Sequence, residues 1–254
     1  MAGTVVHVEA RTLPEAWERS LVELAKVGGR APTEHGDWSI DAPAVIVVEE
    51  PFAEPRVHLK GIVAGSLRGL EEYARQVVYG SCEGVTELFF YTYHERLRHY
   101  PVPSFSPLTG QVVGLEGLDQ IGAMVDKLLS APHTRRAQAI TWVPWKDLKS
   151  DYPPCLQRVW ARVVDGRLRL HAHMRSNDAL KAAFMNMYAF TELQRVVAEA
   201  VRVEPGPYVH FVDSYHVYGR DVKWFRKFVE QIESGESEKC WRTTGEYRRM
   251  AGLG

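Results

Sequence analysis

Residues 153–178 read PPCLQRVWARVVDGRLRLHAHMRSND. Within them, two segments rich in apolar residues flank the dipeptide Asp165-Gly166. Because Asp and Gly tolerate the positive φ that a two-residue turn demands, this dipeptide is among the strongest local signals for a β-hairpin. The stretch therefore predicts two antiparallel strands, with Cys155 at the entrance of the first and Arg175 at the exit of the second.

Helical and extended periodicities surround this hairpin on both sides. They predict helices over 67–79, 118–130, 184–201 and 221–232, and strands over 44–48, 137–143, 157–164, 167–173 and 208–212. Thr12 and Glu15 predict a capping box at the start of a further helix, which Gly28 ends. Residues 101–117, rich in Pro, Ser and Gly, predict a loop. Since no repeat or linker interrupts residues 1–254, a single α+β domain is expected.

The composition is that of an ordinary globular protein, with 254 residues, 45% of them hydrophobic and 25% charged. A net charge of −1 argues against a nucleic-acid partner bound by bulk electrostatics. The chain has three cysteines, and so small and odd a number does not indicate a disulfide framework. Residues 1–10 lack a basic start and a long apolar run, so we expect a cytoplasmic chain with no membrane partner.

Cys155 is the strongest candidate for chemistry. It follows Pro153 and Pro154, and a stiff backbone suits a nucleophile because misplacement is costly. The attacking species is the thiolate, which requires a lowered pKa. Arg175 could stabilise that thiolate or bind a phosphate with its planar guanidinium. The structural alternative is a cysteine that only packs, which is the commoner case for a single residue.

Five further residues could recognise a nucleotide. Asn186 at the start of the buried helix, together with His216 and Tyr218 after a strand, could contact a base edge and a sugar hydroxyl. The pair Arg135-Arg136, between a helix and a strand, suits an anion. Taken singly, each has a structural explanation, such as a satisfied helix cap at Asn186 or a solvated surface for the arginines.

The spacing of these motifs resembles the thymidylate synthase and pyrimidine nucleotide hydroxymethylase family. The matching motifs are Asp119-Gln120-Ile121, Arg135-Arg136, Trp142, Pro154-Cys155, Arg175-Ser176-Asn177-Asp178, Asn186 and His216-Val217-Tyr218. The spacing fits without a gap from Cys155 to Tyr218, and the resemblance covers residues 60–232. It implies an α+β fold with a mixed sheet packed by helices, dimerising through the sheet.

The resemblance also implies a role for each matching residue. Cys155 would add to C6 of a pyrimidine nucleoside monophosphate, so that C5 can attack the methylene of 5,10-methylenetetrahydrofolate. The substrate residues would be Arg175 and Ser176 at the phosphate, Arg135 and Arg136 at the phosphate of the neighbouring subunit, Arg30 in a phosphate loop, Asn186 at the base, and His216 and Tyr218 at the ribose 3′-hydroxyl. Asp178 would contact the folate pterin. No metal is implied.

The family's general-base glutamate is harder to assign. A gapless alignment places Tyr73 there, and Glu72 requires a shift of one residue. Glu71 and Glu87 are alternatives. Tyr93, which matches a family tyrosine, is expected to take part in catalysis with Cys155 and Glu72.

Departures from the family pattern bear on the reaction. Leu156 replaces the usual His, Met174 the usual Gln, Ser214 the usual Asp, and Ala182-Ala183-Phe184-Met185 the usual Gly-x-Pro-Phe. The stretch from Gly80 to Tyr93, which in relatives carries tryptophans over the reactive methylene intermediate, is short, and the familiar carboxy-terminal lid sequence is absent. Loss of this cover favours water addition over hydride transfer. The sequence therefore predicts C5 hydroxymethylation of CMP or dCMP, as in the cytidylate 5-hydroxymethylase of the mildiomycin pathway, which the chain resembles.

Two alternatives remain open. A compact thymidylate synthase would methylate dUMP, and the Asn186 amide can flip to satisfy either uracil or cytosine. A non-catalytic nucleotide-binding module would keep the fold without turnover, although the intact Cys155 argues against it.

Overall fold

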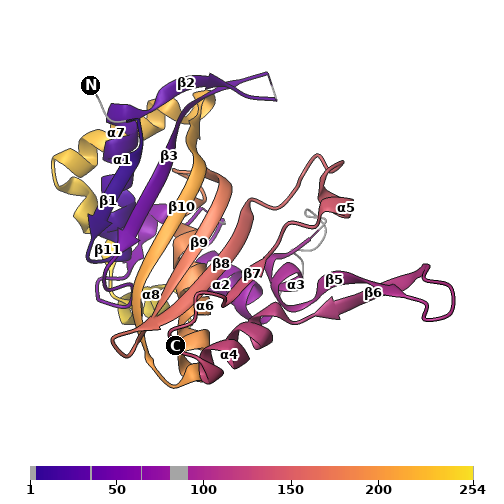
Figure 1. Ribbon diagram of the computed structural model, residues 1–254. Helices are drawn as coiled ribbons and strands as arrows, with labels where there is room; N and C mark the ends of the chain where they lie inside the picture. The colour runs from indigo at the N-terminus through magenta and orange to yellow at the C-terminus, as the bar shows by residue number, and fades with distance from the viewer. Residues whose placement is uncertain (1–3, 35, 64, 81–90, 254) are drawn as a thin grey trace.

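A mixed sheet forms the centre of the computed structural model, which describes residues 4–34, 36–63, 65–80 and 91–253 (Figure 1). Within those residues the sheet has seven strands in the order β1-β3-β10-β9-β8-β7, with β2 paired to β3. The strands are β1 (Val6–Ala10), β2 (Gly29–Pro32), β3 (Trp38–Val48), β7 (Gln138–Ile140), β8 (Leu156–Val164), β9 (Arg167–Asp178) and β10 (Glu204–Tyr218). The pairs β1–β3 and β9–β10 are parallel, and the others are antiparallel. The expected α+β class with a mixed sheet packed by helices is confirmed.

The predicted hairpin of β8 and β9 is confirmed. Asp165 and Gly166 form its turn with φ of 51° and 73°. The second strand runs further than the local pattern predicts, through Asp178 rather than residue 173, because it pairs with parallel β10 up to His216. This extension brings the whole Arg175 to Asp178 motif to the end of the sheet.

Helices cover one face of this sheet. The helices are α1 (Leu13–Val27), α2 (Gly69–Tyr79), α3 (Tyr93–Arg98), α4 (Gln120–Ser130), α5 (Pro144–Asp147), α6 (Ala183–Val201), α7 (Val222–Glu233) and α8 (Thr244–Ala251), with short 3-10 turns at Leu59–Gly61, Gly219–Asp221 and Glu236–Cys240. The aromatic side chains of Trp17, Phe184 and Phe228 pack together between α1, α6 and α7. No helix in the described part of the chain is long and apolar enough to cross a membrane.

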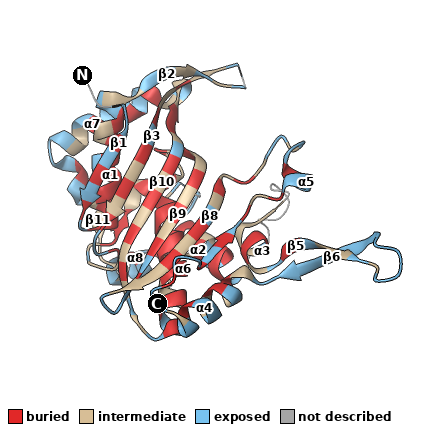
Figure 2. Cartoon of the chain, in the orientation of Figure 1, coloured by how far each residue is buried: buried red, intermediate tan, exposed pale blue. Residues whose placement is uncertain are grey.

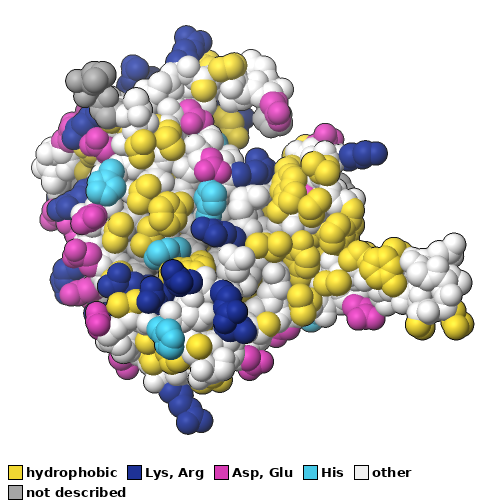
Figure 3. Space-filling model, in the orientation of Figure 1, with side chains coloured by type: hydrophobic (Ala, Val, Ile, Leu, Met, Phe, Trp, Pro, Cys, Tyr) yellow, Lys and Arg dark blue, Asp and Glu magenta, His cyan; other side chains and the backbone are white. Residues whose placement is uncertain are grey.

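The other face of the sheet has no helix over it, and the burial of its strands alternates accordingly (Figure 2). In β8, Val159 and Ala161 are buried, whereas Arg158 and Trp160 point the other way. The open face carries hydrophobic side chains together with histidines and basic side chains (Figure 3). Its aromatic centre is a row in which the Trp160 ring lies 4.7 Å from His171, and His171 lies 5.9 Å from Phe211.

Two local predictions were wrong. Residues 101–117 are not a loop but a ribbon of β5 (Tyr100–Phe105) and β6 (Val112–Leu118), which projects from the body (Figure 1). Prolines are tolerated there because each strand of a two-stranded ribbon has a free edge that needs no N–H. The capping box also fails, since the Thr12 side chain makes no cap bond although α1 begins next to it. Glu15 instead accepts from the Arg11 backbone N–H at 3.0 Å.

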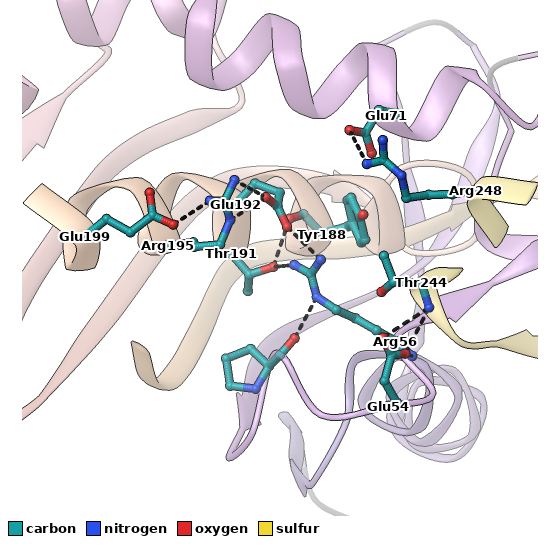
Figure 4. A network of polar contacts seen from close by, with 11 residues as sticks. Glu54, Arg56, Glu71, Tyr188, Thr191, Glu192, Arg195, Glu199, Thr244 and Arg248 are labelled. Carbon is teal, nitrogen blue, oxygen red and sulfur yellow. Dashed lines mark hydrogen bonds and ion pairs between the residues drawn. The ribbon is translucent and has the colours of Figure 1, made fainter. Parts of the chain in front are cut away.

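A polar network behind the sheet fixes the segment after β3 to α6 (Figure 4). Arg56 is buried and donates to Glu192 at 2.6 Å, to Thr191 at 2.9 Å and to the Pro51 carbonyl at 2.9 Å. Nearby, Arg248 of α8 lies 3.5 Å from Glu71 of α2. The C-terminal helix therefore packs behind α2. A two-stranded pair, β4 (Val57–His58) with β11 (Trp241–Arg242), connects the same regions.

Candidate active site

Four strand ends meet at one edge of the sheet. Because β8 runs antiparallel to β9, and β9 runs parallel to β10, the start of β8 lies beside the ends of β9 and β10. The start of β3 joins them, since Asp41 pairs with His216 across β3 and β10. Two cavities of about 520 Å³ and 1040 Å³ open at this edge. They share Cys155, Ser176, His216 and Tyr218, so we describe them as one cleft.

Cys155 lies where the two cavities join. Arg175 is held against it, because its guanidinium donates to the Pro154 carbonyl at 3.1 Å and to the Pro153 carbonyl at 2.7 Å. The nearest guanidinium nitrogen is 3.8 Å from the cysteine sulfur. Burial nevertheless raises the pKa of the Cys155 thiol, and the charge of Arg175 opposes that shift only in part. This direction is opposite to the lowered pKa that a resting thiolate requires.

Three tyrosines surround the thiol. Tyr73 and Tyr93 line the smaller cavity with Cys155, and Tyr91 lines the larger. The Tyr93 hydroxyl accepts from the Leu156 backbone N–H at 3.3 Å. Burial raises the pKa of Tyr91 to about 12 and the pKa values of Tyr73 and Tyr93 further. All three phenols are therefore protonated donors at neutral pH.

Tyr73, not Glu72, reaches the cleft from α2. Tyr73 donates to the Asn186 side-chain oxygen at 2.5 Å, whereas Glu72 is exposed and does not line either cavity. Consecutive side chains on a helix differ in direction by about 100°. The one-residue shift that assigns the general base to Glu72 therefore selects a side chain that points away from the cleft. Glu71 pairs with Arg248 instead, and Glu87 lies outside the described residues.

Asn186 lies on the first turn of α6, with 6% of its surface exposed. Its side-chain oxygen accepts from Tyr73, and its side-chain nitrogen lies 3.7 Å from the Met174 sulfur. No local pattern predicts this contact, because Tyr73 is 113 positions away along the chain.

His216 belongs to a polar chain that begins on β3. Its Nδ1 lies 3.2 Å from the Ser214 carbonyl, and the Ser214 hydroxyl donates to Asp41. Asp213, the acidic neighbour of Ser214, faces the open side of the sheet and pairs with His173 at 2.9 Å. Sequence reasoning missed Asp41, because only the register of β3 on β10 brings it to His216. The Tyr218 ring lies 4.8 Å from the His216 ring.

Asp178 lies at the other end of the smaller cavity. Its Oδ1 accepts from the backbone N–H groups of Leu180 at 3.0 Å and Lys181 at 2.9 Å, and burial raises the pKa of its carboxyl. Neighbouring Asn177 turns inward, where His210 lies 2.9 Å from its side-chain oxygen.

Three predicted phosphate ligands lie outside this cleft. Arg30 is exposed, with its guanidinium 4.4 Å from the centre of the Trp38 ring. Arg135 and Arg136 are exposed between α4 and β7, and the Arg135 carbonyl accepts from Trp160 of the open sheet face at 3.0 Å. One chain therefore does not bring these arginines to Cys155. Among the residues that the structure describes, no His, Cys, Asp and Glu cluster of three or more could hold a metal ion.

Comparisons with known proteins agree with this geometry. A family model described as thymidylate synthase matches residues 86–240. A protein of Methanosarcina barkeri named putative thymidylate synthase is 32% identical over 229 residues, which cover 90% of this chain and 94% of that protein. One of Methanosarcina mazei with the same name is 32% identical over 226 residues, 89% and 95% of the two chains. The chain belongs to the thymidylate synthase family.

A third relative with that name, from Methanocaldococcus jannaschii, is 34% identical over 170 residues, 65% of this chain and 70% of that protein. Members of the thymidylate synthase family bind a pyrimidine nucleoside monophosphate, take a one-carbon unit from methylenetetrahydrofolate and are typically dimeric. In this member of the family, the smaller cavity is lined by a thiol, a buried amide and a histidine, those of Cys155, Asn186 and His216.

Proposed function

We propose that this chain hydroxymethylates C5 of a cytidine 5′-monophosphate, CMP or dCMP, with 5,10-methylenetetrahydrofolate as the donor. The observation that carries the proposal is that Cys155, Asn186 and His216 line one cavity. A nucleophile, a base-reading amide and a sugar-reading imidazole are the groups that such chemistry needs. The alternative within the same family is methylation of dUMP by a compact thymidylate synthase.

The larger cavity suits the phosphate and the sugar. Arg175 and Ser176 line it and would bind the phosphate. The Ser214 carbonyl can only accept, so it receives the Nδ1–H of His216, and Nε2 makes no hydrogen bond among the described residues. That nitrogen, with Tyr218, would bind the ribose 3′-hydroxyl. Asp41 adds a second acceptor to the same side of the cavity.

Cys155 would form the covalent bond to C6 of the base. The electron pair of the C5–C6 double bond would move onto C5, which would bond to the methylene carbon of the folate. The C5 proton would pass to water, tetrahydrofolate would leave, water would add to the methylene, and the Cys155–C6 bond would then break. Because burial raises the pKa of the thiol, Arg175 is needed to favour the thiolate as substrate arrives. Tyr91 and Tyr93 remain protonated and would donate hydrogen bonds to the ring, whereas the Tyr73 hydroxyl is already donated to Asn186.

The smaller cavity has the features that a folate requires. Oδ1 of Asp178 accepts both backbone bonds, so its second oxygen is available to the N–H groups of a pterin. Lys181 and Met185 line the same cavity. When bound there, methylenetetrahydrofolate supplies the one-carbon unit. This chain contributes Asp178 to hold it and an apolar wall to seat it.

The hydroxymethyl product is favoured by the surroundings of Cys155. Tyr73, Tyr91 and Tyr93 line the cavities together with it, and phenols hold water by hydrogen bonds rather than exclude it. Residues 244–253 pack behind α2 and do not line the cleft. The short 81–90 segment lies outside the described residues, so this support rests on the tyrosines and on α8.

We further propose a homodimer formed through the open sheet face. The row of Trp160, His171 and Phe211 gives that face an apolar centre. Arg135 lies at the edge of this face, where its carbonyl accepts from Trp160. In a dimer formed through the face, Arg135 and Arg136 of one chain would therefore lie near the cleft of the other chain. This arrangement would supply the phosphate ligands that one chain lacks.

The decisive experiment weighs the nucleotide products. The enzyme is incubated with methylenetetrahydrofolate and, separately, CMP, dCMP, UMP and dUMP. A mass gain of one CH2O on a cytidine nucleotide, with tetrahydrofolate released, is the expected result. A gain of one CH2 on dUMP, with dihydrofolate released, would identify the thymidylate synthase alternative.

A further inference from the structure

Two neighbours hold the amide of Asn186 in one orientation. The Tyr73 hydroxyl lies 2.5 Å from its oxygen, and the Met174 sulfur lies 3.7 Å from its nitrogen. A flip of the amide exchanges a donor for an acceptor, so contacts with groups of known character decide which atom faces which neighbour.

The two contacts favour the same orientation. A buried phenol that keeps its proton donates, and it therefore needs the amide oxygen. A thioether sulfur carries no proton and only accepts, so it favours the amide nitrogen. A flipped amide would lose the phenol–carbonyl bond and would place its oxygen against the sulfur, with two electron-rich atoms facing each other. Asn186 thus presents its oxygen on the α2 side and its nitrogen on the β9 side.

The position of the sugar then relates the amide to the base. This step rests on the proposed function, in which Cys155 meets C6 and the sugar, bonded to N1, lies at His216. Ring position 4 is opposite N1, so it is the member of the 3,4-edge farther from the sugar. Met174 lies on β9, which pairs with the β10 strand that carries His216, whereas Tyr73 belongs to α2, which packs on α6. The Asn186 nitrogen beside Met174 therefore faces position 3, and its oxygen beside Tyr73 faces position 4.

Only one pyrimidine matches this pattern. Cytosine has an amino donor at position 4 and a bare acceptor nitrogen at position 3, whereas uracil has an acceptor at 4 and a donor at 3. We propose that Tyr73 and Met174 are positioning residues that hold the Asn186 amide so that the cleft selects cytosine over uracil. The selectivity then resides in the neighbours of Asn186, since the amide alone satisfies either base.

The test measures the affinity of CMP, UMP, dCMP and dUMP by calorimetry without folate, for the wild type, Tyr73→Phe and Met174→Gln. The wild type is expected to prefer the cytidine nucleotide of each pair. Tyr73→Phe removes the donor, so the cytidine-over-uridine affinity ratio is expected to fall about tenfold. Met174→Gln is expected to lower it as well, because a second amide pairs with either orientation. Tyr247→Phe is the matched control, since it removes a buried hydroxyl bonded to the Leu67 carbonyl, and it should leave the ratio unchanged.

The outcomes separate this inference from the proposed reaction. An unchanged ratio in both variants, with all affinities lowered equally, overturns the inference, and so does a wild type that prefers uridine nucleotides. A ratio that falls as expected, in a protein that forms no hydroxymethyl product, supports the inference and overturns the reaction. If Tyr73→Phe does not fold by circular dichroism, Met174→Gln decides the question. Failure of every pyrimidine nucleotide to bind overturns both.

Discussion

Two buried histidines differ in how completely the fold uses their hydrogen bonds. His58, fully buried between α1 and α7, has both ring nitrogens engaged. Its Nε2 lies 2.8 Å from Glu18, and its Nδ1 accepts from the Lys60 backbone at 3.1 Å. Glu18 also accepts from Trp241 at 2.9 Å. This cluster is complete without any ligand.

His216 lies in the opposite situation. It is 6% exposed, and its Nδ1 is engaged by the Ser214 carbonyl at 3.2 Å. Among the described residues, no hydrogen bond is formed at its Nε2, which belongs to a ring that lines the cleft. Burial is thus the same in both clusters and does not separate structure from function. The difference lies in unused hydrogen-bonding capacity directed into a cavity.

The largest expected effect is the loss of turnover when the cleft loses its nucleophile. Cys155→Ala should abolish product formation, because no other described thiol lines the cleft. Nucleotide affinity should persist, since Arg175, Asn186 and His216 remain. Mass analysis of products together with calorimetry checks both points. Cys240→Ala is the matched control and should keep wild-type turnover. Undiminished turnover in Cys155→Ala would remove the covalent mechanism.

Glu18→Ala should break the complete cluster. It leaves the donors of His58 and Trp241 buried without an acceptor, at a cost of about 1–3 kcal/mol each. We expect the free energy of unfolding in urea to fall by about 3 kcal/mol, with nucleotide affinity of the folded protein retained. His216→Gln should do the reverse, with stability nearly unchanged and nucleotide affinity lower by about tenfold. If the two variants lost stability equally, the contrast between the clusters would fail.

Arg136→Ala tests whether the cleft is completed by a second chain. Each charge-assisted contact with phosphate contributes about 1.5–3 kcal/mol, so nucleotide KM should rise by one to two orders of magnitude. Arg226→Ala, which removes an exposed charge from α7, is the control and should have little effect. Mixing Arg136→Ala with Cys155→Ala should restore activity, because a heterodimer rebuilds one intact site. Verified heterodimers without activity would argue that the arginine does not act in trans.

Local signals in the sequence predicted the hairpin and its motif, but not the neighbours that complete the site. The Asp165-Gly166 turn depends on two adjacent residues, so its prediction needed no tertiary information. Asp41 reaches the cleft only through the pairing of β3 with β10, which joins residues 175 positions apart. Whether Glu72 or Tyr73 points into the cleft depends on how α2 is rotated about its axis. The spacing between motifs does not determine that rotation to within one residue. The 101–117 ribbon was missed because its composition is also that of a loop.

The smallest expected effect is a change in how steeply stability falls in mild acid, caused by a third histidine beneath the cleft. His210 is fully buried, with Nδ1 2.7 Å from the Tyr208 hydroxyl and Nε2 2.9 Å from the Asn177 oxygen. Burial lowers the pKa of His210 from 6.5 to about 3. Burial lowers the pKa of His58 as well. Both histidines are therefore neutral in the folded state over a range where the unfolded chain binds protons.

The sign of the pH dependence follows from that difference. Above pH 6.5 neither state binds the proton, so stability is unaffected. Below it the unfolded chain gains a proton that the fold excludes, and each such histidine lowers the free energy of unfolding by about 1.4 kcal/mol per pH unit. Urea titrations from pH 7.5 to 5 should show this decline. His210→Gln, which keeps a donor and an acceptor without titrating, should flatten the slope of this decline. An identical slope in His210→Gln would mean that His210 is protonated inside the fold, and the cleft floor would then carry a charge next to Asn177.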